Sequence, residues 1–303
     1  MKVFIAGATG AIGRPLVSAL VAARHEVIGM TSTEAGLRVL QERGAEGIVA
    51  DALDQEAVRA AVQKIRPQAA IEELTSLPKR YTPEEMRAAA SRDRTLRLEG
   101  GRNVYEAART TGVQRYLVQS TGFFYAPGAG LATEGEPLAH QASPGIAGSV
   151  GTYTQVEARV LGHPDMEGVA LRYGFFYGPG TYHDPRNGSI SEQVRDRQYP
   201  VIGSGQGVFS FVHVEDAAAA TVAALDGRPG VYNIVDDNPS EMAVWLPAFA
   251  HFLGAPSPSH LGEEEALQRE GPDAVYYATQ LRGAANTKAK RELHWRPRRL
   301  EWL

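Results

Sequence analysis

Residues 1–13 read Met1-Lys-Val-Phe-Ile-Ala-Gly-Ala-Thr-Gly-Ala-Ile-Gly13, and they set the architecture of the chain. The uncharged apolar run before Gly7 predicts a short strand that is buried on both faces. Gly7 permits a tight turn, Gly10 lets the backbone approach a pyrophosphate closely, and Gly13 lets the following helix pack against the strand. That helix would aim its N-terminal N–H groups at the phosphates. The stretch therefore predicts a dinucleotide site.

The context of this glycine triplet makes the prediction specific. Gly-rich turns are common, but here the triplet follows a strand and precedes Pro15 to Val21, which is typical of a helix with proline in its first turn. We expect cofactor contacts from the glycines themselves and from the residues between and after them. They are Gly7, Thr9, Gly10, Ala11, Ile12, Gly13 and Arg14.

Length and composition exclude several classes of protein. The 303 residues can bury a sizeable core, and 43% hydrophobic with 22% charged residues is typical of a soluble globular protein. A net charge of −4 gives no basic surface for nucleic acid, and the basic cluster near the C-terminus fits a solvated helix face. No apolar run approaches the roughly 18 residues of a membrane span.

The reactive side chains narrow the chemistry further. The chain has no cysteine, which rules out disulfides, a thiolate nucleophile and cysteine-ligated zinc. No cluster of His, Asp and Glu has the spacing of a metal site. We therefore expect a soluble, cytoplasmic protein that uses neither a metal nor a membrane.

The end of the second predicted strand bears on the choice of cofactor. An Asp or Glu at this point would bind the ribose hydroxyls of NAD. After the strand from His25 to Met30 the chain instead has Thr31, Ser32 and Thr33, and Glu34 is displaced into the next turn. We expect Thr31 and Ser32 to contact NADP, with NAD as the alternative, and Arg14 and Arg38 could meet a 2′-phosphate.

Further strands alternate with helices along the first 175 residues. A third strand, Gly47 to Asp51, places Asp51, Ala52 and Leu53 where an adenine would lie. Strands are also predicted at 69–75, 115–121 and 168–174. Such alternation indicates right-handed βαβ units and a parallel sheet.

Two stretches of this half leave alternatives open. Glu72 and Glu73 are unusual in a buried parallel strand, and they mark either its exposed C-terminal end near the reaction site or an early end of the strand. Residues 122–150 are rich in Gly, Pro, Ala and Ser and predict a long flap over the cofactor, followed by a helix at 152–161.

Several stretches resemble the extended short-chain dehydrogenase/reductase superfamily, in its NAD-dependent epimerase/dehydratase group. The matching segments occur in the family's order along nearly the whole chain. They are Gly7 to Gly13, Gly112 to Thr121, Leu171 to Gly180, Phe211 to Ala218 and Asn286 to Pro297. The resemblance implies an α/β fold, a Rossmann-type doubly wound parallel sheet with a smaller C-terminal substrate lobe.

The resemblance also implies a division of the chain. Residues 1–175, completed by 208–236, would form the dinucleotide-binding domain, and residues 176–207 and 237–303 would form the substrate lobe. Helix-mediated dimers of the superfamily imply a homodimer.

The catalytic pattern of the family is altered here. The family uses a Ser or Thr at the end of strand five and a Tyr followed four residues later by Lys, because the ammonium lowers the Tyr pKa while the hydroxyl orients a carbonyl. Thr121, with Ser120 beside it, fits the Ser/Thr place. Tyr153 is the only tyrosine of the expected helix, and Glu157 stands four residues on.

Two registers fit this helix. In the first, Tyr153 is the family's tyrosine and Glu157 takes the lysine place, where a carboxylate would raise the phenol pKa. In the second, Glu157 matches a glutamate further along the family's helix, and Ser149 and Tyr153 take the Tyr and Lys places. The spacing from Glu157 to Arg172 favours the second register. In both registers the Tyr-Lys pair is missing, and Tyr153 is a candidate proton donor.

The segment that would cover the substrate lacks the positive charge expected for a nucleotide sugar, so we expect a smaller, less charged carbonyl compound. Tyr125, Tyr177 and His183 are candidate substrate contacts. The sequence thus predicts an NADP-dependent oxidoreductase of the epimerase/dehydratase type that acts on a hydroxyl/carbonyl group of a small metabolite. A non-redox cyclase, isomerase or dehydratase on the same fold, and an NADP-sensing protein without turnover, are the alternatives.

Overall fold

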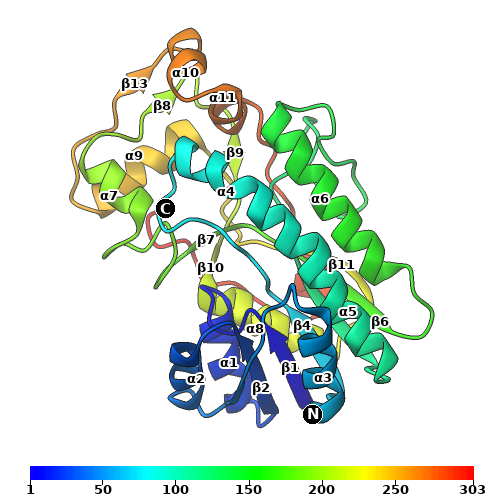
Figure 1. Cartoon of the computed structure of the whole chain (residues 1–303). Helices are drawn as coiled ribbons and strands as arrows, with labels where there is room; N and C mark the ends of the chain where they lie inside the picture. Colours follow the sequence, from blue (N-terminus) through cyan, green and yellow to red (C-terminus); the bar gives the residue numbers. More distant parts are fainter.

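The computed structural model describes the whole chain, Met1–Leu303, and is built on a seven-stranded parallel sheet (Figure 1). The strand order is β11-β6-β5-β4-β1-β2-β3, so the order reverses between β1 and β4, which lie side by side. The strands are β1 (Lys2–Ala6), β2 (Glu26–Thr31), β3 (Glu46–Val49), β4 (Ala69–Glu72), β5 (Arg115–Thr121), β6 (Glu167–Tyr173) and β11 (Gly230–Ile234). The predicted fold class, a doubly wound Rossmann-type sheet, is confirmed.

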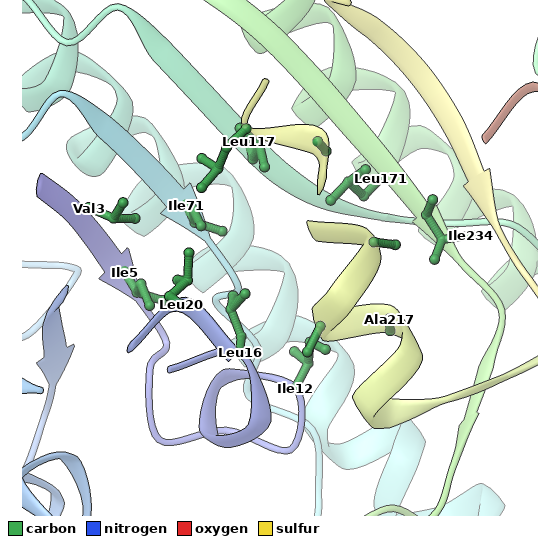
Figure 2. Packing of buried hydrophobic residues seen from close by; sticks show 14 of the residues in the cluster. Val3, Ile5, Ile12, Leu16, Leu20, Ile71, Leu117, Leu171, Ala217 and Ile234 are labelled. Atoms are coloured by element: carbon green, nitrogen blue, oxygen red, sulfur yellow. The ribbon is translucent and has the colours of Figure 1, made fainter. Parts of the chain in front are cut away.

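Helices cover both faces of this sheet, each over its own apolar core. On one face lie α1 (Gly13–Ala22), α2 (Glu34–Gln41) and α8 (Val214–Ala224). Figure 2 shows Leu16 and Leu20 of α1 beside Ile5 of β1 in this core. The opposite face is covered by α3 (Gln55–Ile65), α5 (Gly101–Thr110) and α6 (Pro144–Leu161).

A π-helical turn interrupts the long helical run that lies between β4 and β5. Helix α4 (Pro83–Thr95) passes into η1 (Leu96–Gly100), a π-helical turn, and then into α5. A Cβ atom on Gly101 would lie 2.2 Å from Oε1 of Glu72. The glycines here therefore allow the helix to approach the end of β4 closely.

The smaller lobe is built around a core of aromatic side chains that includes Trp245, Phe249 and Trp302. Its strands are β7 (Phe175–Tyr177), β8 (Val201–Ile202), β9 (Val208–Phe209), β10 (Phe211–His213), β12 (Ser240–Glu241) and β13 (His260–Leu261). Its helices are α7 (Ser189–Arg195), α9 (Met242–Phe252), α10 (Glu263–Arg269) and α11 (Pro272–Thr279). The last helix, α12 (Thr287–Glu292), packs on the main sheet, because Ala289 belongs to the α1 and α8 core.

The expected flap differs from the structure. Helix α6 begins at Pro144 and not near residue 152, because Ile146 and Val150 in its first turns are buried in the core of the lobe. The irregular part is therefore shorter than predicted. No helix anywhere in the chain combines the length and the apolar character that crossing a membrane requires.

Candidate active site

The glycine loop after β1 has room for nothing larger than glycine at two positions. Gly7 has φ +86°, and a Cβ atom there would lie 2.4 Å from the carbonyl oxygen of Glu73, across the point where the strand order reverses. A Cβ atom on Gly13 would lie 2.3 Å from the carbonyl oxygen of Gly7. The loop is thus folded tightly under the start of α1, at the place where open α/β sheets bind ligands.

The start of α1 offers unpaired hydrogen-bond donors. The N–H groups of Ala11 and Ile12 donate to no backbone acceptor, and no side chain caps the helix. Free N–H groups at a helix N-terminus are suited to a phosphate. The residues present therefore fit the pyrophosphate of a dinucleotide.

Hydrogen bonds hold the loop after β3, where the sequence predicts the adenine. The Asn103 amide donates to the carbonyl of Ala52 over 2.9 Å, and Asp51 accepts from the backbone N–H of Leu53 over 2.9 Å. Leu53 is 46% exposed although it is apolar, which suits a flat ring lying against it.

The end of β2 carries hydroxyl groups and no carboxylate. Thr31 is buried, and its Oγ1 packs closely against Gly36. A Cβ atom on Gly36 would lie only 2.0 Å from this oxygen. Thr33 caps α2 by accepting from the N–H of Gly36, which holds the loop with exposed Ser32 at its tip. Glu34 is turned into the first turn of α2.

Arg14 links the glycine loop to the second half of the chain. Its Nε donates to the carbonyl of Gly10 over 3.4 Å. Its Nη2 lies 3.0 Å from the place of a Cβ atom on Gly180, in the turn that leads into the lobe. Arg14 therefore lies between the glycine loop and the turn at Gly180.

A buried ion pair fixes the rotation of α6 against the sheet. The Glu157 carboxylate accepts from Nε and Nη2 of Arg172, each over 2.7 Å, and from the hydroxyl of Ser120 over 2.5 Å. The pairing raises the pKa of Arg172 against the opposing effect of burial. Glu157 thus makes the contact with Arg172 that the second register requires, and the Ser120 hydroxyl is used to hold it.

Two hydroxyl groups of the predicted catalytic set have no partner inside the chain. Oγ1 of Thr121 is buried and unpaired. Tyr153 is partly exposed on the same helix as Glu157, and its ring packs 6.2 Å from that of Phe124. Burial raises the pKa of Tyr153, and the charge of Arg97 acts in the opposite direction. As catalytic residues, Thr121, Tyr153 and Ser120 stay predictions.

Sequence reasoning missed Arg97, which the π-helical turn η1 brings to this place. Its guanidinium carbon lies 4.9 Å from the centre of the Tyr153 ring, and its Nε donates to Asp93 over 2.7 Å. Asp93 also accepts from the backbone N–H of Ser76, which follows β4. The signal was hidden among several arginines of α4, although the Asp93 to Arg97 spacing of one helical turn could have indicated a pair.

Glu72 and Glu73, the acidic pair at the end of β4, are buried, so the alternative of an exposed strand end is wrong. The strand ends at Glu72, whose carboxylate accepts from Arg159 and from Tyr116. Glu73 accepts from the Tyr173 hydroxyl over 3.0 Å, and its other oxygen has no partner. Burial raises the pKa of Glu73 to about 8.

The three predicted substrate contacts lie in the interior. Tyr125 is 0% exposed and donates to Asn233 while accepting from Arg172. Tyr177 is 0% exposed with an unpaired hydroxyl. His183 bonds through Nδ1 to the Phe176 carbonyl, and burial lowers its pKa to about 4. These side chains are used inside the protein, and their contact with a substrate stays a prediction.

The reversed strand order, the glycine cradle and the free N–H groups of α1 define a Rossmann protein that binds a dinucleotide. The sequence model of the NAD dependent epimerase/dehydratase family matches residues 3–234, and the chain belongs to this family. A "3-diazoavenalumate denitrifying reductase" from Streptomyces sp is 39% identical over 305 aligned residues, which span 100% of this chain and 98% of the relative.

A more distant relative is also a reductase. A "4-hydroxy-2-methyl-3-oxo-4-farnesyl-3,4-dihydroquinoline-1-oxide ketoreductase" from Stigmatella aurantiaca is 28% identical over 97% of this chain and 91% of its own. The family and these relatives support an enzyme of the oxidoreductase or epimerase type.

Solved structures give the same architecture. UDP-glucose 4-epimerase from Thermus thermophilus, in complex with NAD, aligns with TM-score 0.72 and 26% identity over 98% of this chain and 94% of its own. UDP-glucose 4-epimerase from Thermotoga maritima, with UDP-glucose, aligns with TM-score 0.77 and 21% identity over 98% and 94%. Together with the family, the first of these supports a nicotinamide dinucleotide as the cofactor.

Proposed function

We propose that this protein is an NADPH-dependent reductase of a small metabolite whose hydride acceptor needs no Tyr-Lys proton relay. One observation carries the proposal. The Glu157–Arg172 pair fixes the rotation of helix α6, yet Ser149 and Tyr153 stand two turns and one turn before Glu157, where the family has Tyr and Lys. The rotation of the helix is retained and its proton chemistry is altered.

The reductase from Streptomyces suggests which acceptor this is. Its name denotes the reductive removal of a diazo group, and 39% identity over the whole chain makes the same class of substrate our leading candidate here. The reduced nicotinamide would supply the hydride in R–N₂⁺ + NADPH → R–H + N₂ + NADP⁺, in which a C–H bond forms and the C–N electrons leave with dinitrogen. Carbonyl reduction makes an alkoxide that must be protonated, but this reaction makes none.

The chain's own residues would then bind and orient. The N–H groups at the start of α1 would hold the pyrophosphate, and the apolar Leu53 would support the adenine. Thr121, whose buried hydroxyl is unpaired, and Tyr153, whose hydroxyl makes no hydrogen bond in the chain, would orient polar atoms of the substrate. The preference for NADPH rests on the hydroxyl residues at the end of β2, where an NAD enzyme would have a carboxylate.

A ketone is the second candidate acceptor. It is favoured by the partly exposed Tyr153, whose hydroxyl is free to give a proton, and by the ketoreductase relative. In that case Tyr153 would act as the acid that the family's tyrosine provides, without a lysine beside it.

The Tyr153→Phe variant separates the two acceptors. NADPH consumption and product formation are measured with an aromatic diazo acid and with a panel of ketones. For a diazo acceptor we expect turnover within about threefold of the wild type, whereas a ketone reductase would lose about 100-fold or more. NADPH binding should be intact in both cases. Tyr105→Phe, which removes an unpaired hydroxyl on α5, is the matched control. Product formed without NADPH consumption would instead support a non-redox enzyme.

A further inference from the structure

Arg97 is held rigidly at the predicted reaction site by contacts on three sides. The π-helical turn η1 carries it, and its own carbonyl accepts from Nη1 of Arg159 over 3.2 Å. Its Nε is tied to Asp93, and the flat guanidinium lies over the Tyr153 ring. π-helical turns inside helices occur frequently at functional sites.

The outer edge of the same guanidinium is free. The side-chain hydrogen bond of Arg97 is made by Nε, and Nη1 and Nη2 bond to no group of the chain, although the side chain is only 5% exposed. The two terminal nitrogens therefore keep their hydrogen-bonding capacity in a side chain that is mostly buried, and a ligand that accepts from them would gain affinity. An arginine stacked on an aromatic ring loses little freedom when it binds such a ligand.

We propose that this edge of Arg97 is a subsite for a carboxylate of the substrate, bound through both terminal nitrogens. The inference rests on the proposed reductase function and adds the charge of the substrate to it. Two N–H donors side by side match the two oxygens of a carboxylate. The ring of Tyr153, whose hydroxyl makes no hydrogen bond in the chain, lies under the guanidinium.

The surrounding charges leave room for an added anion. Asp93 is engaged by Nε of Arg97 and by the backbone of Ser76, and Glu72 is paired with Arg159. Glu73 is the remaining acid near Arg97, and burial raises its pKa to about 8, so at neutral pH it is mainly uncharged. The phosphates of the dinucleotide would bind at the start of α1, which packs on the opposite face of the sheet from α5 and α6.

The test compares trans-cinnamate with its neutral amide, trans-cinnamamide, as ligands of the full chain saturated with NADP⁺. Affinities are measured by isothermal titration calorimetry for the wild type, Arg97→Met, Arg97→Lys and Arg94→Met. Arg94 is an exposed arginine of the same helix without a hydrogen-bond partner, and it serves as the matched control. Thermal melts show whether each variant is folded, and the cinnamate to cinnamamide ratio in the wild type needs no variant.

We expect the wild type and Arg94→Met to bind the carboxylate about 10- to 100-fold more tightly than the amide. Arg97→Met should remove this ratio while NADP⁺ affinity stays within about threefold, and Arg97→Lys should keep part of it. Equal affinity of the two ligands for the wild type, or no binding of cinnamate at millimolar concentration, would overturn the subsite. An Arg97→Met variant that loses NADP⁺ affinity and keeps the ratio would assign Arg97 to the cofactor instead. Failure of the wild type to bind NADP⁺ would refute the reductase, a separate result.

Discussion

The glycine loop at the start of α1 and helix α6 on the opposite face of the sheet differ in how closely their sequences resemble the family. The loop keeps each glycine that its turn requires, and its ligand groups are backbone N–H groups. Helix α6 has the Glu157–Arg172 pair that orients it, but Ser149 and Tyr153 stand where the resemblance to the family implies Tyr and Lys. Under the proposed function, binding of the cofactor would rest on backbone geometry, whereas the chemistry would rest on side chains that can be replaced.

The sharpest way to break this comparison is to place a side chain in the loop. In Gly7→Val the new Cβ would collide with the Glu73 carbonyl at 2.4 Å, and the backbone there has a positive φ. We expect no measurable NADPH binding by calorimetry together with a lower melting temperature, because backbone and not a flexible side chain must move.

Two further variants calibrate that result. Gly10→Ala brings its Cβ only to 3.3 Å from the Gly7 carbonyl, so we expect a loss of NADPH affinity of about tenfold in a folded protein. Gly262→Ala, where the added Cβ meets nothing within 4 Å, should bind NADPH like the wild type. Undiminished binding by Gly7→Val would show that the loop does not hold the cofactor.

Breaking the Glu157–Arg172 pair, which fixes the rotation of α6, should have the next largest effect. Glu157→Gln leaves the Arg172 charge buried without its partner, and we expect the free energy of unfolding to fall by about 3–5 kcal/mol. Urea denaturation measures it. The matched control is Glu265→Gln, which breaks an exposed pair with Arg269 and should cost no more than about 0.5 kcal/mol. Equal losses in the two variants would mean that the buried pair does not organise the helix.

The same contrast explains what could be predicted from the sequence. The strands and the glycine loop follow from apolar runs and from glycine positions, which act locally, and their order along the chain was sufficient for the sheet. Helix α6 was placed too late because Pro144 to Val150 is rich in Gly and Ser, and only burial against the distant lobe makes it helical.

At the site the limit was the pairing of side chains over long sequence distances. The sequence does not indicate that the Tyr125 hydroxyl bonds to Asn233, more than 100 residues away, and its contact with a substrate stays a prediction. Arg97 was overlooked because its stacking on Tyr153 depends on a π-helical turn that no local pattern signals. The Glu157–Arg172 pair could be anticipated, since Arg172 stands in a segment that resembles the family and Glu157 matches a glutamate of the family's helix in the second register.

Glu73 follows β4 directly and lies beside the glycine loop, and its ionisation should make the stability of the protein depend on pH. Its pKa is raised from 4.5 to about 8, chiefly by burial, so the folded protein holds a proton that the unfolded chain has lost in this window. Its contribution to stability is therefore fully present below about pH 4.5 and is lost as the pH rises to about 8. Tyr173, Arg97 and Glu72 are the polar groups that act on it.

Glu73→Gln imitates the protonated acid and should remove this dependence. We expect the unfolding free energy of the variant to exceed that of the wild type increasingly between about pH 5.5 and 7.5, by up to about 1.4 kcal/mol per pH unit. Taking the difference between the two proteins cancels the titration of His183 and Asp236, which both share. A difference that stays constant with pH would show that Glu73 is ionised in the folded protein.

The smallest expected effect concerns the one part of cofactor binding that side chains decide, the choice between NADPH and NADH. Arg38 is exposed on α2 and has no partner in the chain, so it is free to meet a 2′-phosphate. In Arg38→Ala we expect NADPH affinity to fall about tenfold and NADH affinity to be unchanged, and Arg59→Ala on α3 is the control for lost charge.

Ser32→Asp tests the same point in the opposite direction. A carboxylate at the exposed end of β2 would repel a 2′-phosphate and accept from the ribose hydroxyls of NADH, so the preference should move toward NADH. Equal affinity of the wild type for the two cofactors would contradict the NADPH assignment while leaving the glycine loop intact. Specificity would then belong, like the chemistry on α6, to the replaceable side chains, because the backbone cradle binds the pyrophosphate that both cofactors share.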